Sequence, residues 1–360
     1  MMTQHLLTQE AELSRSRSDA RASWSTRVLL DMALHDWLIG IYFVVVLIAL
    51  VAGTGPNRPV CIQRVITDLC IFGVGVGVTR GLIHPNGSFG ALVSALVYRM
   101  TIFGAVFLSY FQLRDILPAV SGRAVDAQLY AFDMKVFHYE PSVAWDQFVN
   151  PTTTEWFSFF YFSYFAILIV HVLPALMCLK NEVLISQFAL GIFVVFTSAH
   201  TLYMVVPGYG PYAHLASSFQ HPLPNGFFWG LVRETVSAGG AQKDIFPSLH
   251  TAAPTFLAIY SFRHRKHLPF KYTWPLMAFF ALQIIGATMF LRWHYLIDIF
   301  AGLTLAAFAN FIGATVCPWE SVRRERLGSG PIFPPLSLAF MRRGGKSARG
   351  SDTFARADID

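Results

Sequence analysis

The stretch WLIGIYFVVVLIALVAGTGP, Trp37 to Pro56, contains no charged residue. The hydrocarbon core of a bilayer requires about 20 consecutive, mostly apolar residues from a helix that crosses it. This stretch therefore predicts a transmembrane helix. The whole chain has the same character, because 54% of its 360 residues are hydrophobic and only 13% are charged, whereas a soluble domain carries about 25% charged residues. The composition excludes an ordinary soluble domain and predicts an all-α, polytopic membrane protein.

Further apolar stretches along the chain predict a bundle of about eight transmembrane helices. Four more are clear, and they cover residues 156–179, 183–207, 272–291 and 296–319. Three are weaker because a charge or a proline interrupts the apolar run, and they cover 65–83, 88–113 and the helix that follows Ser248. The aromatic run WFSFFYFSYF, residues 156–165, is typical of side chains that face lipid or the membrane interface.

The distribution of basic residues predicts the orientation of the helices. Cytoplasmic segments of membrane proteins are enriched in Lys and Arg. With eight spans, most of the Lys and Arg residues fall on the side that holds both termini and the loop RHRKHLPFK, Arg263–Lys271. We therefore expect both termini in the cytoplasm and residues 207–247 on the outer face, in the cell membrane if the protein is bacterial.

A polar cluster, QKDIFPSLHTAAP, interrupts the apolar pattern at Gln242–Pro254. Pro247 and Ser248 suit the start of a helix, where a serine caps the first turn and free backbone N–H groups can bind an anion. His250 lies one turn into this helix and is expected to point at the same place. An imidazolium there could protonate a departing oxygen.

A second cluster, LRWHYLID, lies at Leu291–Asp298 on the same predicted face of the membrane. If this stretch is helical, His294 and Asp298 share one face because they are four positions apart. The carboxylate can then accept the Nδ1 proton of the imidazole and leave Nε2 free as a nucleophile or base. Ionisable groups this close to a membrane core are costly and usually functional.

Other interpretations of these residues exist. His294 and Asp298 could form an interfacial pair that only packs helices. His250, His294 and Asp298 could also hold zinc, because three protein ligands and a water form a catalytic zinc site. In a transporter, the same residues would line a proton or ion path. The chain lacks the internal repeat and the matching pair of broken spans that are typical of transporters.

The two clusters resemble signature motifs of the type 2 phosphatidic acid phosphatase superfamily. DIFPSLHTAAP and, about forty residues later, RWHYLIDIFAGL are similar to its second and third motifs. The branch with inositol phosphorylceramide synthases is the most similar, because a bulky residue, here Leu249, precedes its motif histidine. YMVVPGYGPYAH, residues 203–214, and DAQLYAFDMKVFHYEPS, residues 126–142, also resemble that branch. The resemblance covers roughly residues 126–314.

The resemblance implies a mechanism for this chain. His294 would attack phosphorus and form a phosphohistidine, Asp298 would orient His294, and His250 would protonate the leaving alcohol. Ser248 would help to hold the phosphate. No metal or other cofactor is implied. The implied partners are a membrane lipid and an alcohol or lipid acceptor.

The chain departs from the superfamily pattern in its cationic residues. The first motif, a lysine followed after six residues by Arg-Pro, is absent, and Thr288 stands where an arginine commonly precedes the third-motif histidine. Phosphoryl transfer depends on cations that clamp the phosphate oxygens. The candidates to replace them are Arg292, Lys243 and Arg233 as cations and Tyr209 and Tyr212 as neutral donors.

The sequence therefore predicts a membrane enzyme that transfers a phosphoryl or phospho-head-group, most similar to an inositolphosphotransferase that makes a sphingolipid. A lipid phosphate phosphatase is the alternative. The expected regions are a basic cytoplasmic segment (1–34), two accessory transmembrane helices (35–87), a catalytic membrane domain (88–319), and a basic, disordered cytoplasmic tail (320–360). The tail is expected to meet an anionic membrane surface, and nothing indicates nucleic acid binding.

Overall fold

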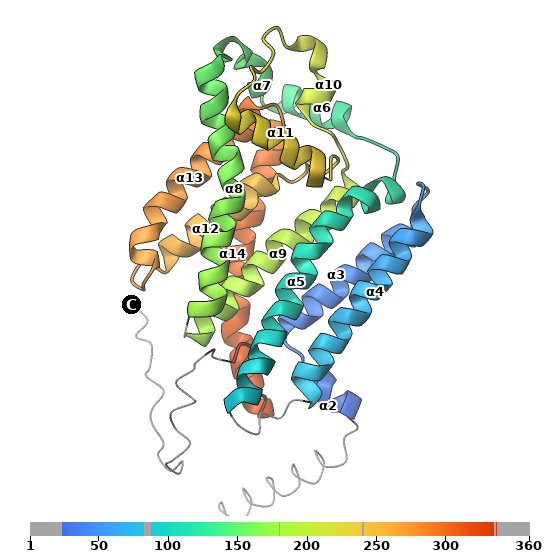
Figure 1. Ribbon diagram of the computed structural model, residues 1–360, viewed down its shortest axis with the longest axis vertical. Helices are drawn as coiled ribbons and strands as arrows, with labels where there is room; N and C mark the ends of the chain where they lie inside the picture. The colour runs from blue at the N-terminus through green and yellow to red at the C-terminus, as the bar shows by residue number, and fades with distance from the viewer. Residues whose placement is uncertain (1–23, 83–87, 180, 240, 335, 337–360) are drawn as a thin grey trace, which may run out of the picture.

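A computed structural model describes residues 24–82, 88–179, 181–239, 241–334 and 336. Within these residues the chain forms helices and no β-strand, which confirms the predicted all-α class. Residues 1–23 of the basic N-terminal segment and residues 337–360 of the basic tail lie outside the described residues. Most helices run side by side along the long axis of one bundle (Figure 1).

The helices follow one another along the chain with short connections. They are α2 (Trp24–Asp31), α3 (Leu34–Ala52), α4 (Arg58–Gly77), the π-helical turn η1 (Val78–Leu82), α5 (Ser88–Val120), α6 (Asp126–Val136), α7 (Pro141–Ala144), η2 (Asp146–Phe148), α8 (Pro151–Cys178), α9 (Glu182–Val205), α10 (Pro211–His214), η3 (Ala216–Ser218), α11 (Phe227–Gly239), α12 (Leu249–Arg263), α13 (Phe270–Phe290) and α14 (Leu296–Leu327).

Seven of the described helices are long and apolar enough to cross a membrane: α3, α4, α5, α8, α9, α13 and α14. The weakest of the predicted spans, residues 65–83, corresponds to α4. The predicted span after Ser248 is α12, which has 15 residues and is therefore only about 22 Å long. It packs against α9, α13 and α14, so α12 lies inside the bundle and is shorter than the seven longer helices.

Helix α9 forms the centre of the bundle (Figure 1). Most of its residues are buried, whereas each of the other spans buries less than half of its most apolar segment. A helix that is apolar all round is buried on all sides, and one that leaves an apolar face uncovered in a membrane protein exposes it to lipid. The structure is thus a multi-pass membrane bundle built around α9.

The short helices α6, α7, α10 and α11 gather at one end of the bundle, and α2 lies at the other end, beside the end of α14 (Figure 1). We call these the site end and the far end. Residues 126–142 form α6 and the start of α7 at the site end. The prediction of a disordered tail from residue 320 is wrong for residues 320–334, because α14 continues to Leu327 and Phe333 is buried.

A buried carboxylate joins the accessory helices to the rest of the bundle at the far end. Asp36 in α3 is fully buried and accepts hydrogen bonds from the backbone N–H of Ala33 (2.8 Å) and the hydroxyl of Tyr98 in α5 (2.7 Å). It also pairs with the Nε atom of Arg80 in η1 at 3.1 Å. Because all these groups are shielded from water, each depends on the others to satisfy its charge or hydrogen bonds.

We expect Asp36→Ala to lower the free energy of unfolding by about 3–5 kcal/mol, because it leaves the buried Arg80 charge unpaired. The measurement is unfolding of the purified protein in detergent by denaturant. Asp115→Ala is the matched control: it breaks an ion pair with Arg64 in which both side chains are about half exposed, and such pairs contribute at most about 1 kcal/mol. Similar losses for the two variants would contradict the structural role of Asp36.

Candidate active site

His294 and Asp298 come together at the start of α14. The Nδ1 atom of His294 lies 3.4 Å from Oδ2 of Asp298, and the two side chains are 5% and 0% exposed. The same Oδ2 accepts the backbone N–H of Tyr295 at 2.8 Å. The two residues do not share a helix, because α14 begins at Leu296 and His294 precedes it in the turn after α13. Asp298 instead caps its own helix and presents its carboxylate to the imidazole.

His250 lies opposite this pair, in the first turn of α12. Ser248 caps α12 as predicted, with its Oγ accepting the N–H of Thr251 at 3.2 Å. The His250 ring stacks between Tyr161 and Tyr164 of α8, at centroid distances of 4.2 and 4.1 Å. Its centroid is 6.4 Å from that of His294. The two histidines of the two motifs therefore face one space at the site end.

The two tyrosines correct the interpretation of the aromatic run in α8. The run was expected to face lipid or the interface, and some of its side chains, such as Trp156, are exposed. Tyr161 and Tyr164 are instead buried and hold the His250 ring from both sides. An aromatic run shows no periodicity that separates lipid-facing from site-facing positions, so the sequence could not distinguish them.

Close contact between α12 and α14 sets the relative position of the two histidines. The backbone N–H of Ser248 donates to the carbonyl of Asp298 at 3.1 Å. One turn further along α14, a Cβ added at Gly302 would lie 2.7 Å from the carbonyl oxygen of Ser248. Glycine is therefore required at this position, because any side chain would push the two helices and the two motifs apart.

Helix α6 contributes two buried carboxylates that hold the loops of the site. Asp133 accepts the backbone N–H groups of Leu296 (2.6 Å) and Ile297 (3.0 Å) at the start of α14. Burial raises the pKa of Asp133 to about 6, although these two hydrogen bonds act in the opposite direction. Asp126 accepts the backbone N–H of Gly210 at 2.8 Å and the hydroxyl of Tyr295 at 3.2 Å.

The sequence prediction missed Asp126 and Asp133 as site residues. The available signal was their spacing, because acids seven positions apart lie on the same face of a helix. Gly210, whose N–H group donates to Asp126, contacts the loop before His294 closely. It adopts a φ of 100°, and a Cβ there would collide with the carbonyl of Trp293. The loop that carries His294 is thus held by hydrogen bonds to α6 and by close contact with Gly210.

Asp244 is a third acid that the prediction did not single out, although it belongs to the quoted motif. Its Oδ2 accepts the hydroxyl of Tyr110 at 3.5 Å, and burial raises its pKa. Burial also lowers the pKa of His294 to about 4, and the nearby Asp244 carboxylate opposes this effect. His294 is therefore neutral near pH 7, which is the state that a nucleophile requires.

Two of the three predicted phosphate-binding cations, Arg292 and Lys243, have other partners. Nη2 of Arg292 donates to Oδ1 of Asp146 at 2.7 Å and to the carbonyl of His221. Nζ of Lys243 donates to the carbonyls of Ser121 (3.3 Å) and Arg123 (3.2 Å). The structure therefore uses both side chains to fasten loops at the site end.

The two predicted neutral donors, Tyr209 and Tyr212, lie in the loop between α9 and α10 and in α10 itself. The backbone N–H of Tyr209 donates to Asp126, and the Tyr209 ring lies beneath Lys243, 5.4 Å from its Nζ. Tyr212 packs on Trp293 at 4.8 Å and is 38% exposed. Of the described residues, no group of three His, Cys, Asp or Glu side chains is arranged to hold a metal ion, so the zinc alternative gains no support from this geometry.

The fold and the site define a multi-pass membrane protein with a His–Asp pair that faces a second histidine. A sequence model of the PAP2 superfamily matches residues 127–312, a range that contains His250, His294 and Asp298. The chain belongs to this superfamily, which supports an enzyme of lipid phosphatase or phosphotransferase type that acts on a membrane lipid. The comparisons with curated proteins and with solved structures found no match.

We expect Asp133→Ala to lower kcat toward a phospholipid about 100-fold, because the start of α14 loses its acceptor and His294 shifts. Asp133→Asn keeps one oxygen acceptor and should lose less. Lys135→Ala, an exposed position on the same helix, is the control and should behave like the natural protein. A loss in Asp133→Ala no larger than in this control would contradict the positioning role, provided that unfolding measurements show all three variants folded.

Proposed function

We propose that the protein transfers a phosphoryl or phospho-head-group from a membrane lipid to an acceptor through a covalent intermediate on His294. The observation that carries this proposal is the placement of the His294–Asp298 pair, at 3.4 Å, opposite the ring of His250. A nucleophile, the group that orients it and a proton donor are the three functions that a covalent phosphoryl transfer requires.

In the first step, Nε2 of neutral His294 attacks phosphorus as the bond to the leaving oxygen breaks. His250 gives its proton to that oxygen, which leaves as an alcohol. Asp298 faces the Nδ1–H group, which keeps its proton, and stabilises the positive charge that develops on the imidazole. In the second step, the oxygen of the acceptor attacks phosphorus, its proton passes to His250, and the bond between phosphorus and Nε2 breaks. These residues supply every proton transfer, so we propose that no metal or cofactor takes part.

The phosphate oxygens need donors in both steps. Ser248 and the N–H groups at the start of α12 are positioned on the His250 side, where a helix N-terminus favours an anion. Arg292, Lys243, Tyr209 and Tyr212 remain the candidates from the loops. Tyr212 is the most available of these, because the charges of Arg292 and Lys243 are engaged by Asp146 and by backbone carbonyls.

The motifs favour transfer to an alcohol over hydrolysis. We propose an inositolphosphotransferase-like activity in sphingolipid metabolism, because Leu249 precedes the motif histidine, as a bulky residue does in the inositol phosphorylceramide synthase-like branch, and because the usual first-motif cations are absent. If water takes the place of the alcohol, the same chemistry makes the enzyme a lipid phosphate phosphatase. The identity of the second nucleophile therefore separates the two activities.

We expect His294→Ala to lower the formation of every product at least about 1000-fold, because no other group can form the covalent intermediate. The assay supplies a head-group-labelled phospholipid with and without a lipid acceptor and measures free phosphate against new phospholipid. His267→Ala is the matched control, because His267 is exposed in the loop between α12 and α13. Substantial turnover by His294→Ala would refute the nucleophile assignment. Free phosphate as the main product would show a phosphatase.

We also propose that the site end lies on the outer face and that both termini are cytoplasmic. The basic loop after α12 and the end of α14 lie away from the site end (Figure 1), and Lys and Arg are enriched in cytoplasmic segments. A reporter fused after Asp360 should therefore give a cytoplasmic signal. A periplasmic or lumenal signal would invert the proposed orientation.

A further inference from the structure

Four buried carboxyl groups converge on the start of α14. We call them the acid cluster, and they belong to Asp126, Asp133, Glu140 and Asp298, each at most 6% exposed. The three aspartates accept hydrogen bonds from the consecutive residues 295–297. Glu140 directly precedes α7 and interacts electrostatically with Asp133 and Asp298. The proposed mechanism uses Asp298 and gives Glu140 no role.

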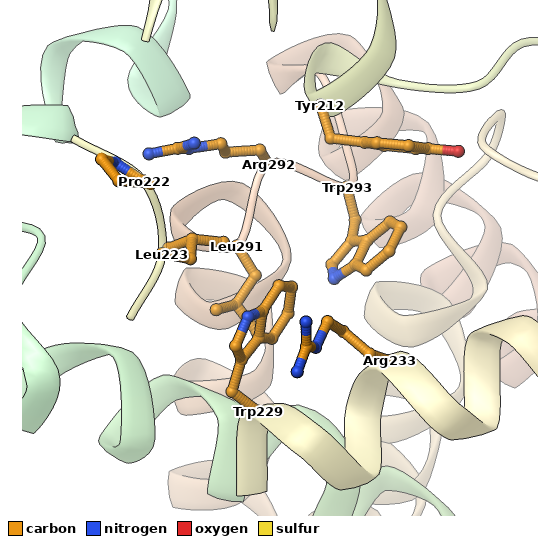
Figure 2. A pocket seen from close by; sticks show the side chains of 8 residues that line it. All are labelled: Tyr212, Pro222, Leu223, Trp229, Arg233, Leu291, Arg292 and Trp293. Atoms are coloured by element: carbon orange, nitrogen blue, oxygen red, sulfur yellow. The ribbon is translucent and has the colours of Figure 1, made fainter. Parts of the chain in front are cut away.

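The acid cluster has little positive charge to balance it. Among the described residues, the ion pairs include one member of the cluster, Asp298, which faces His294. Burial lowers the pKa of His294 to about 4, so this partner is neutral near pH 7. Arg233 and Arg292 line the cavity beside the link between α13 and α14 (Figure 2), and Arg292 is already paired with Asp146. Ionised members of the cluster therefore repel one another without a cation between them.

Glu140 has one oxygen atom that no donor reaches. Its Oε1 accepts the backbone N–H of Ser142 at 3.1 Å and the Ser142 hydroxyl at 2.6 Å, whereas Oε2 is buried without a hydrogen bond. Burial of an incompletely satisfied carboxylate is far less favourable than burial of the neutral acid. Burial raises the pKa of Glu140 to about 7, and the charges of Asp133 and Asp298 act in the same direction, against the hydrogen bonds from Ser142.

The elements around Glu140 bring it acids or no charge. Its electrostatic partners are Asp133 in α6 and Asp298 in α14. Helix α13, which packs against α7, has no ionisable side chain from Thr273 to Phe290. The turn that follows α7, η2, carries Asp146, and the charge of this acid is already matched by an arginine. An ionised Glu140 thus has no cation with which to pair.

The acid cluster links the proton on Glu140 to the position of the nucleophile. Asp133 and Asp298 hold the backbone that follows His294, and a negative charge on Glu140 repels both. We propose that Glu140 is a positioning residue that keeps the start of α14 in place only while it carries a proton, so that the site responds to the pH on its own side of the membrane. This regulation rests on the proposed function, because it acts through the proposed nucleophile.

The sign of the pH dependence follows from the raised pKa. The unfolded chain loses the Glu140 proton near pH 4.3, the ordinary value of a glutamic acid, whereas the folded protein keeps it up to about pH 7. The stability that the proton contributes is complete below the unfolded pKa and is lost as the pH rises through the folded pKa. The hold on the site therefore weakens, and activity falls, as the pH rises through about 7.

The pH dependence of kcat tests the role of Glu140, with the purified full-length protein in detergent and a head-group-labelled phospholipid. Glu140→Gln keeps an acceptor for Ser142 and cannot ionise. The ratio of its kcat to that of the natural protein should rise at least about tenfold between about pH 6 and about pH 8.5, because only about 3% of a group with a pKa near 7 keeps its proton at the higher pH. The titrations of His250 and His294 occur in both proteins and cancel in the ratio.

Glu234→Gln is the matched control, because Glu234 is an exposed acid on α11, outside the acid cluster. Its ratio to the natural protein should be the same at every pH. A ratio for Glu140→Gln that does not change with pH, while lipid is turned over, would overturn the regulation and leave the proposed function standing. An equal rise in Glu234→Gln would also overturn the regulation.

Hydrogen exchange tests the same assignment in the natural protein, without a variant and without turnover. The backbone N–H groups of residues 295–297 donate to Asp133 and Asp298. Their protection, corrected for the intrinsic exchange rate at each pH, should fall at least about tenfold between about pH 6 and about pH 8.5. Unchanged protection would overturn the assignment. A pH-dependent loss of protection in a protein that turns over no lipid would refute the proposed function and support the positioning by Glu140.

Discussion

The backbone N–H groups at the start of α14 are the constraint on which the site depends. The first turn of any helix leaves such groups without partners inside the helix, so they need acceptors from elsewhere. Two buried carboxylates do so here: Asp133 accepts from Leu296 and Ile297, and Asp298 accepts from Tyr295. The backbone that follows His294 is therefore held in a single arrangement, and the imidazole is positioned with it.

The site carries less free positive charge than phosphoryl transfer usually uses. The guanidinium of Arg292 is matched by Asp146, and the ammonium of Lys243 is matched by two carbonyls. The proposed chemistry then relies on the imidazole of His250 and on the dipoles of N–H groups, which are fixed before the substrate arrives and need no reorganisation during the reaction. Arg292 and Lys243 thus hold the loops of the site in place, whereas the sequence predicted that they bind phosphate.

Local patterns were predictable from the sequence, and contacts between distant residues were not. Apolar runs predicted the spans, including the weak second one, and the cap at Ser248 followed from residue type alone. The short length of α12 did not follow from the sequence, because an apolar run does not show whether protein or lipid surrounds it. The pairing of Arg292 with Asp146, and of Asp133 with the start of α14, joins residues more than 140 positions apart. No rule based on sequence spacing predicts contacts between residues so far apart in the chain, so these partners were identified only from the structure.

The burial of Phe333 has a consequence for the boundaries of the enzyme. Its ring packs against His35 of α3 at 5.5 Å and Tyr98 of α5 at 5.4 Å, and nearby Arg324 donates to the carbonyl of Asp31. Residues from both sides of the family match are thus interleaved in one core. The far end of the matched segment is accordingly covered by chain that lies outside it, because His35 bonds the carbonyl of Ser186 and the N–H of Ile332 donates to Glu182.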